Sequence, residues 1–211
     1  MIPPAGTTSA TRTRAKRGEG DKLREVILDR AEELLLETGS QEAVSIRAIA
    51  DRCGVTPPAI YMHFVDKEAL FLEVCSRRFR ELDAWIESAS RVATDPLDEL
   101  RIRGAAYVTF GLEHPEAYRL LMMGQREGHI DDPGMEAGRD AFLHMVEAVD
   151  RCVKAGALGG GADPYQTSLV LWSGIHGVTS LMISFKNFDW GDRDQLVERV
   201  LDVLIEGVLS T

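Results

Sequence analysis

The 211-residue chain is poor in the residues that build disulfide frameworks and metal sites. Its three cysteines, Cys53, Cys75 and Cys152, are odd in number, widely spaced and free of any Cys-x-x-Cys pair. This pattern argues against disulfides and zinc and predicts buried thiols, with a redox-sensing role left open for Cys53. The five histidines show no metal-ligand spacing, so we expect no metal site.

Motifs for catalysis and for secretion are also missing. The glycines at 159–161 lack the Gly-Lys-Ser/Thr ending and the preceding strand of a phosphate loop, and there is no nucleophile elbow. No segment alternates apolar and polar residues as a strand does, and Pro and Gly separate helical patterns, which predicts an all-α fold. No apolar stretch follows the basic N-terminus as it would in a secretory signal, so we expect a cytoplasmic protein. The missing catalytic motifs separately lead us to expect no catalytic residues.

The net charge of −10 is unevenly distributed along the chain. Residues 1–65 contain nine Lys or Arg and nine Asp or Glu, so the remaining residues, with fifteen basic and twenty-five acidic side chains, carry the whole excess. A basic arm over residues 1–20 carries four closely spaced cations, Arg12, Arg14, Lys16 and Arg17. We expect this arm to be disordered when free, and its binding to phosphates or a minor groove is an open alternative.

Residues 44–67 contain two short helices joined by a sharp turn. Ser45 is a favourable N-cap for the first helix, and Gly54 supplies the left-handed residue that ends it. Thr56 caps the second helix, and Pro57 occupies its first position, where a missing N–H costs nothing. This layout is typical of a helix-turn-helix, whose second helix enters the major groove of DNA. A plain αα-hairpin is the alternative, but helical stripes upstream and downstream complete a compact three-helix unit.

The motif resembles the TetR (tetracycline-repressor-like) family of bacterial transcription regulators. The resemblance runs through Ile27 to Gly39, Ser45 to Val55, Thr56 to Phe64 and Asp66 to Leu70. It implies mainly phosphate contacts for five residues: Ser45, Thr56, Tyr61, His63 and Lys67. It implies that five others lie near bases or the groove wall: Arg47, Pro57, Pro58, Ala59 and Met62. Because methionine and proline are poor hydrogen-bond readers, we expect sequence choice to come from arginine, apolar contacts or DNA shape.

The last two helical segments, 164–186 and 193–209, are apolar on more than one face. Their length and internal polar residues argue against a membrane span, so they need a second packing surface. A stripe of small residues at helical spacing would let a partner helix approach closely: Ser173, Gly177, Ser180 and Ser184. We therefore predict a homodimer through these two helices, with packing inside one chain as the alternative.

The segment Trp172-Ser-Gly-Ile-His176-Gly177 further resembles the Trp-His-Gly signature of one C-terminal subgroup of TetR-like regulators, and residues 113–118 fit the same subgroup. Membership implies a pocket in each subunit for a mostly apolar ligand with one or two polar handles. Candidate lining residues are Tyr107, Phe110, His114, Tyr118, Met122, Phe142, Met145, Trp172 and His176. A plain core role stays open for each of them, since aromatic and Met side chains at helical spacing usually fill space.

The expected organisation is a basic arm at 1–20, a helix-turn-helix DNA-binding domain at 21–66 and a helical ligand-binding and dimerisation domain at 67–211. The predicted function is a ligand-responsive repressor that binds a palindromic operator as a homodimer and is released by a small, mostly apolar molecule. Ligand binding is expected to shift the helix at 67–90 and so change the separation of the two recognition helices. A small-molecule carrier or an enzyme without a role on DNA is the alternative, and neither would need the unit at 45–67.

Overall fold

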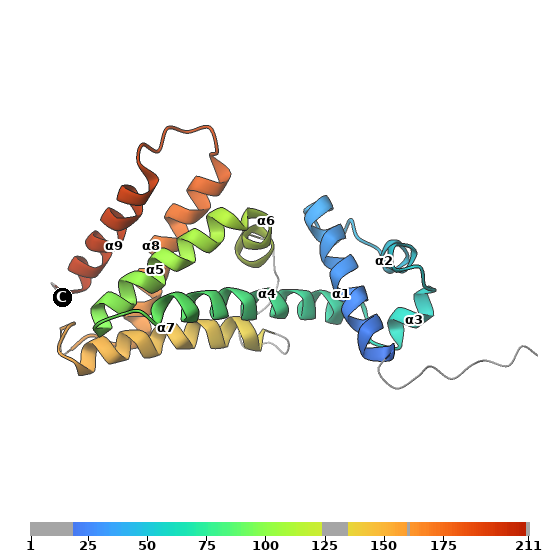
Figure 1. Cartoon of the computed structure of the whole chain (residues 1–211), viewed down its shortest axis with the longest axis horizontal. Coiled ribbons are helices and arrows are strands. Elements are labelled where there is room, and N and C mark those ends of the chain that lie inside the picture. Colours follow the sequence, from blue (N-terminus) through green and yellow to red (C-terminus); the bar gives the residue numbers. More distant parts are fainter. Residues whose placement is uncertain (1–18, 124–134, 160, 210–211) are drawn as a thin grey trace, which may run out of the picture.

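The computed structural model describes residues 19–123, 135–159 and 161–209. Of the basic arm expected at residues 1–20, only residues 19 and 20 fall within these ranges. Within them the regular secondary structure is entirely helical, so the predicted all-α fold is confirmed (Figure 1). The first helices are α1 (Glu19–Thr38), α2 (Ile46–Cys53), α3 (Pro57–Tyr61) and α4 (Lys67–Ser90). After them come α5 (Pro96–Glu113), α6 (Pro115–Tyr118), a π-helical turn η1 (Arg119–Met123), α7 (Glu136–Lys154), α8 (Pro164–Ser184) and α9 (Arg193–Leu209). None of the helices in the described ranges is long and apolar enough to cross a membrane.

Aspartate caps determine where three of the longer helices begin. Asp66 accepts a hydrogen bond from a backbone N–H of the first turn of α4, with an O···N distance of 2.7 Å. Asp95 accepts two such bonds of 2.9 Å at α5, and Asp163 accepts one of 2.8 Å at α8. Pro96 and Pro164 follow these caps directly, where their fixed φ favours the helix and their missing N–H costs nothing.

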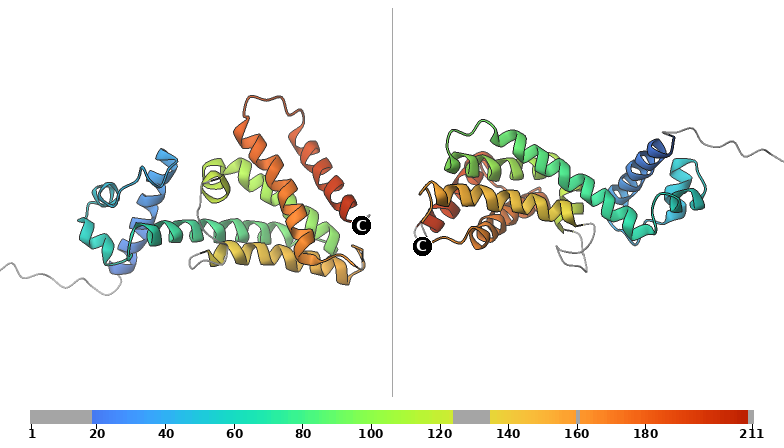
Figure 2. Two further views of the ribbon diagram at one scale, coloured as in Figure 1. Left: turned by 180° about the vertical axis from the view of Figure 1, so that it is seen from behind. Right: turned by 90° about the horizontal axis from the view of Figure 1, so that it is seen from below.

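Helix α4 runs through both halves of the molecule (Figure 1). Helices α1 to α3 gather around one end of it, whereas α7 lies along the rest and α5, α8 and α9 complete a bundle (Figure 2). The first turns of α4 contribute three buried side chains to the N-terminal core: Leu70, Phe71 and Val74. The next turns contribute three others to the C-terminal core: Cys75, Phe79 and Leu82. The two cores therefore meet on one uninterrupted helix.

A buried carboxylate fastens α1 to α4. Glu32 on α1 is only 3% exposed, and its carboxylate pairs with Arg77 at 2.5 Å and also with Arg78. The Arg77 guanidinium reaches Asp29 on α1 as well, at 2.6 Å. A buried charge with several hydrogen-bonding partners fixes relative orientation, because any movement that breaks the pairs leaves the charge unsolvated.

The three thiols differ in their burial. Cys75 and Cys152 are buried as predicted, whereas Cys53, at the end of α2, is only half-buried. Burial raises the pKa of Cys152 to about 11 and also raises the pKa of Cys53 above its usual value. Because the thiolate is the reactive form, these shifts make both thiols less reactive at neutral pH.

Candidate nucleic-acid interface and ligand cavity

Local backbone signals build the turn between α2 and α3. The Ser45 hydroxyl accepts a hydrogen bond of 3.1 Å from a backbone N–H one turn later, and Gly54 ends α2 with a left-handed φ of 69°. Thr56 has the extended backbone of an N-cap, but its side chain makes no capping hydrogen bond, so the expected cap is one of position only. Pro57 and Pro58 then begin α3, because proline holds φ at a helical value.

The residues assigned to DNA contact form an outward face at the end of the molecule. Tyr61 is 53% exposed and Met62 is 79% exposed, whereas the adjacent Ile60 is fully buried and anchors α3. The other exposed members are Ser45, Arg47, Thr56 and Pro58, and the half-buried ones are Pro57, Ala59 and His63. Hydroxyl and guanidinium groups suit phosphates and base edges, and exposed apolar groups suit thymine methyls.

Lys67 is placed differently from the other predicted phosphate ligands. Its ammonium group donates hydrogen bonds to the carbonyl oxygens of Gln41 and Val44, at 3.0 and 3.2 Å. It also lies 5.6 Å from the centre of the Phe71 ring. Two of its three N–H groups therefore join the start of α4 to the loop before α2, which leaves one for a phosphate.

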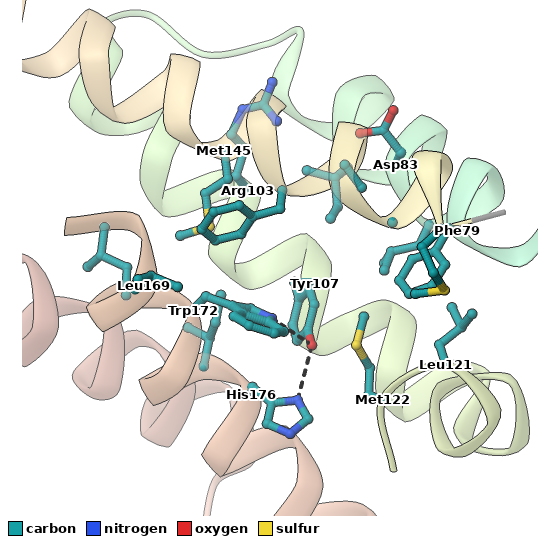
Figure 3. Close-up of a pocket in the computed structure, with 18 of the residues that line it drawn as sticks. Phe79, Asp83, Arg103, Tyr107, Leu121, Met122, Met145, Leu169, Trp172 and His176 are labelled. Atoms are coloured by element: carbon teal, nitrogen blue, oxygen red, sulfur yellow. Dashed lines mark hydrogen bonds between the residues drawn. The ribbon is translucent and has the colours of Figure 1, made fainter. Parts of the chain in front are cut away.

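A cavity of about 890 Å³ lies in the C-terminal bundle, with walls from α4, α5, α7, α8, α9 and η1 (Figure 3). Its lining also includes Gln41 and Glu42 from the loop between α1 and α2, so it extends to the N-terminal half. Most lining side chains are aliphatic, aromatic or Met. A concave, mainly apolar space of this size with a few polar groups is typical of sites for small organic ligands.

Six of the nine predicted lining residues lie along this cavity: Tyr107, Met122, Phe142, Met145, Trp172 and His176. The other three lie behind its wall. Phe110 and Tyr118 are fully buried in the core, and the His114 ring packs against Trp85 of α4, with 5.8 Å between ring centroids. Phe110 on α5 and His114, which directly follows α5, are one and two turns beyond Tyr107 and face Trp85 rather than the cavity.

A chain of neutral polar groups lies at one side of the cavity (Figure 3). Trp172 Nε1 donates to the Tyr107 hydroxyl at 3.3 Å, and the Tyr107 and Tyr118 hydroxyls are 3.2 Å apart. The Tyr118 hydroxyl is 2.7 Å from His176 Nδ1, and His176 Nε2 is 3.2 Å from the Ser180 hydroxyl. Burial lowers the pKa of His176 and raises the pKa of both tyrosines, so all three groups are uncharged at neutral pH.

Ser180 was expected in the outward stripe of small residues, but its hydroxyl instead lies next to the His176 ring. Ser173 and Ser184 are exposed, and a Cβ built on Gly177 would meet no atom within 4 Å. The small-residue stripe therefore keeps three of its four expected members on the outside.

The structure adds lining residues that the sequence analysis did not assign to a ligand site. Helix α4 contributes Phe79 and Asp83, and α5 contributes Arg103, which is 7% exposed (Figure 3). The Arg103 guanidinium pairs with Glu87 and, at 2.9 Å, with Glu99. The available sequence signal was the position of Arg103 directly before the mainly apolar run at 104–112, since a cation buried there requires partners.

Two family models match the chain. A model described as bacterial regulatory proteins, tetR family, matches residues 27–74, and one described as tetracyclin repressor-like, C-terminal domain, matches residues 100–204. The first match contains the outward face of α2 and α3. The second contains most of the bundle around the cavity.

Two relatives are transcription regulators, and a solved structure shares the fold. The HTH-type transcriptional activator FasR of Mycolicibacterium smegmatis is 33% identical over 124 residues, which are 59% of the chain and 55% of FasR. The HTH-type transcriptional repressor BepR of Brucella suis is 35% identical over 85 residues, 40% of each protein. The matches thus span about half of these relatives' length. A solved structure of a protein with unknown function from Rhodococcus sp. RHA1 is 28% identical with a TM-score of 0.76, and covers 89% of this chain and 95% of its own.

Proposed function

The chain belongs to the TetR family of bacterial transcriptional regulators, and we propose that it binds a palindromic DNA operator as a homodimer and releases it when a small, mostly apolar molecule occupies the cavity. The observation that carries this proposal is the capped turn between α2 and α3, which holds Tyr61 and Met62 outward above a buried Ile60. A short helix anchored on one side and exposed on the other is what the major groove accepts.

The proposed dimer forms through α8 and α9. Both helices leave apolar side chains exposed in the single chain, Val170 and Leu181 on α8 and Val203 on α9, and Phe185 directly after α8 is exposed too. The open space around Gly177 on α8 gives a partner helix room for close approach. A twofold dimer presents two recognition helices to half-sites about 34–36 Å apart, which accounts for the proposed palindrome.

Helix α4 is the proposed route from the cavity to DNA. Phe79 on this helix lines the cavity, and the pairing of Glu32 with Arg77 fastens the same helix to α1. A ligand that displaces α4 therefore moves α1 to α3 with it and changes the separation of the two DNA-reading faces. A coupling free energy of about 1–3 kcal/mol weakens operator binding roughly 5–150-fold.

The proposed direction of control is repression. For a repressor, a ligand that reduces operator affinity gives repression in its absence and expression in its presence. The chain resembles both an activator, FasR, and a repressor, BepR. Transcription from the operator-bearing promoter, measured with and without the protein, distinguishes the proposed repression from activation.

The test of DNA binding is fluorescence anisotropy with the DNA that flanks the protein's own coding region, in a salt series and with unrelated competitor DNA. We expect saturable, competitor-resistant binding at two chains, or a multiple of two, per site. Arg47→Ala should weaken specific binding by about 1–3 kcal/mol, because Arg47 is exposed on the DNA-facing side of α2. Arg91→Ala, an exposed arginine after α4, is the matched control. Binding of the unmodified chain that competitor DNA removes equally well from every site contradicts the proposal.

The test of the cavity uses Phe142, whose ring packs edge-on against Trp172 and Tyr165, with centroid distances of 5.8 and 5.4 Å. Phe142→Ala should weaken binding of the apolar fluorescent probe anilinonaphthalene sulfonate severalfold and leave operator binding without ligand unchanged. Phe188→Ala, which truncates an exposed ring outside the cavity, is the control. Equal probe affinity in Phe142→Ala and in the unmodified chain would place the probe elsewhere.

A further inference from the structure

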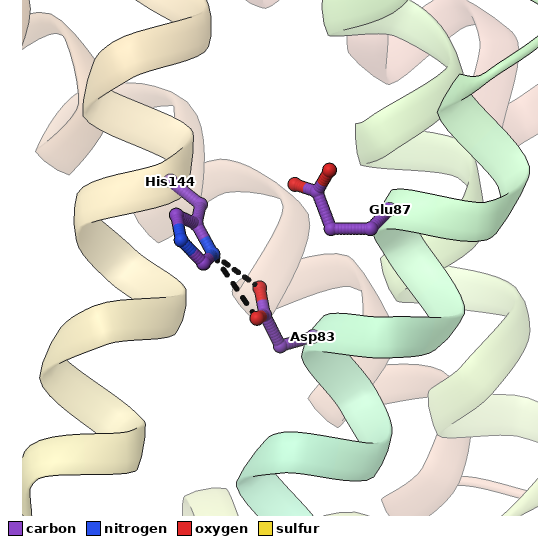
Figure 4. Close-up of side chains that lie close together, drawn as sticks. All are labelled: Asp83, Glu87 and His144. Atoms are coloured by element: carbon purple, nitrogen blue, oxygen red, sulfur yellow. Dashed lines mark hydrogen bonds and ion pairs between the residues drawn. The ribbon is translucent and has the colours of Figure 1, made fainter.

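Three side chains from two helices converge in the space between α4 and α7 (Figure 4). Asp83 and Glu87 are one turn apart on α4, and His144 faces them from α7. One ligand atom from each residue lies within 4.8 Å of the other two. The His144 Nδ1 atom is 2.9 and 3.0 Å from the two Asp83 carboxylate oxygens. We propose that Asp83, Glu87 and His144 form a binding site for a divalent first-row transition-metal ion such as Zn²⁺.

The donor set determines the class of ion. One imidazole nitrogen with two carboxylates suits zinc and its neighbours, whereas Mg²⁺ and Ca²⁺ prefer sites made of oxygen alone. With metal–ligand distances of about 2.0–2.2 Å, donor atoms lie roughly 3–3.5 Å apart around the ion. The Asp83 and His144 atoms are already close to that separation, so only the Glu87 carboxylate has to approach.

A second layer of contacts holds Glu87 toward the other two donors. Arg103, which is buried on α5, pairs with the Oε1 atom of Glu87 and leaves Oε2 for the ion. The same guanidinium binds Glu99, and Arg151 binds Glu99 in turn at 2.6 Å. Outer partners of this kind orient ligating carboxylates in metal sites and tune their affinity.

The site has an entry path from solvent. An open groove runs between α4 and α7, and Asp83 and His144 form part of its wall. Its other charged lining residues are mainly acidic: Glu73, Glu136, Asp140 and Glu147, with Arg80 as the cation. A groove of one predominant sign raises the local concentration of counter-ions, so this one attracts cations toward the three donors.

An ion bound here would cross-link α4 to α7. Asp83 lines both this outer groove and the inner cavity, so it is a wall element of each. Metal binding would therefore fix one side of the cavity as well as the relative position of the two helices. The site itself does not depend on the proposed role in transcription, and it can be tested without DNA or effector.

The experiment uses the full chain without an affinity tag, treated with chelator and then titrated with Co²⁺ and Zn²⁺. We expect visible d–d absorption from one Co²⁺ per chain, its loss when Zn²⁺ displaces Co²⁺, and a rise in unfolding temperature on Zn²⁺ addition. Asp83→Asn and His144→Gln should each weaken Zn²⁺ binding at least about tenfold, as expected for the loss of a ligand. Competition with a chromophoric chelator measures that change.

Asp140→Asn is the matched control, because it removes one carboxylate from the same groove and leaves the three donors intact. It should change Zn²⁺ affinity by less than about twofold, the small effect of one solvated charge. If it weakens binding as much as Asp83→Asn, the ion is attracted by diffuse charge and the proposed site is wrong. Absence of Zn²⁺ binding to the unmodified chain, or equal binding to folded His144→Gln, also overturns the proposal. Circular dichroism establishes folding, and Glu87→Gln replaces any variant that does not fold.

Discussion

His176 is partly buried among uncharged groups, with no carboxylate hydrogen-bonded to its ring. Its two ring nitrogens face the Tyr118 and Ser180 hydroxyls, and the Tyr107 hydroxyl lies 3.3 Å from Nδ1. The pKa of each tyrosine is raised by burial, so both remain neutral phenols. Desolvation consequently lowers the pKa of His176 below 6.5.

This shift predicts how His176 affects stability as the pH changes. The unfolded chain protonates the imidazole near pH 6.5, whereas the folded chain does so only at lower pH. The contribution of His176 to the free energy of unfolding is therefore complete above that pH and decreases as the pH falls below it. NMR titration should give a pKa below 6.5, and the difference in unfolding free energy between the unmodified chain and His176→Gln should decrease toward acidic pH. A difference that does not vary with pH contradicts this prediction.

The cavity was predictable from sequence only in part. The family resemblance implied lining roles for Tyr107, Trp172 and Phe142, which lie along the cavity, but also for Phe110, which packs in the core. Apolar residues do not reveal which helix face borders a void, because voids and cores require similar side chains. The trio of Asp83, Glu87 and His144 could not be found by motif spacing either, since its members come from different helices.

The contact of α1 with α4 depends on Glu32. Glu32→Gln removes the buried charge that Arg77 and Arg78 share, and both arginines are still partly solvated, which limits the loss. We expect the free energy of unfolding to fall by about 1.5–3 kcal/mol, the usual range for hydrogen bonds to a charged group. Urea unfolding measures this. Glu33→Gln alters exposed pairs with Arg30 and Arg52 and should have a clearly smaller effect, because solvent screens exposed ion pairs. Equal effects would mean that the buried pairing adds nothing.

The packing of α8 on α9 depends on Gly174, whereas the small-residue stripe expected from the sequence contains Gly177. A Cβ on Gly174 would lie 2.5 Å from Leu204 Cδ1 on α9, whereas one on Gly177 would meet no atom within 4 Å. Gly174→Ala therefore requires the half-buried Leu204 side chain to move, which should make this variant about 1 kcal/mol less stable than Gly177→Ala. Gly177→Ala should leave the stability of the single chain equal or slightly higher, because alanine favours helix. Thermal unfolding under dilute, monomeric conditions compares the two, and the reverse order would contradict this packing.

Helix boundaries were the most predictable feature, because caps and prolines act locally. The expected helices at 67–90 and 193–209 begin and end where the sequence indicated. The helix expected to end at Lys186 ends at Ser184, since Phe185 leaves the helical conformation with φ of −110° and ψ of 63°. No proline or glycine marks that end in the sequence.

Apolar side chains on α8 and α9 are exposed in the single chain, so the oligomeric state of the protein tests whether a second chain covers them. Leu181→Glu places a carboxylate in that surface and should shift the chain from dimer to monomer, because an interface cannot desolvate an unpaired charge. Sedimentation velocity over a concentration series measures the change. Val92→Glu, a similarly exposed apolar position between α4 and α5, should leave the dimer unchanged. A monomeric unmodified chain, or a dimer unaffected by Leu181→Glu, would exclude this interface.

The domain boundary expected at residue 66 coincides with the start of α4, but the N-terminal and C-terminal hydrophobic cores are not separated at that residue. Leu70, Phe71 and Val74 lie beyond it and are buried in the N-terminal core. The sequence could not reveal this, because a long helix with one apolar stripe gives no sign of where one core ends and the next begins.

Because both cores share α4, this helix determines where chimeric regulators built from this protein can be joined. A transplanted DNA-reading head cut before Lys67 would lose the side chains at 70, 71 and 74 that fill its interior. It would receive in their place whatever the recipient helix carries, with cavities or clashes as the result. A graft that retains its first two turns of α4 and joins after Val74 keeps each interior with its own sequence. The useful crossover point is therefore inside a helix rather than in a loop.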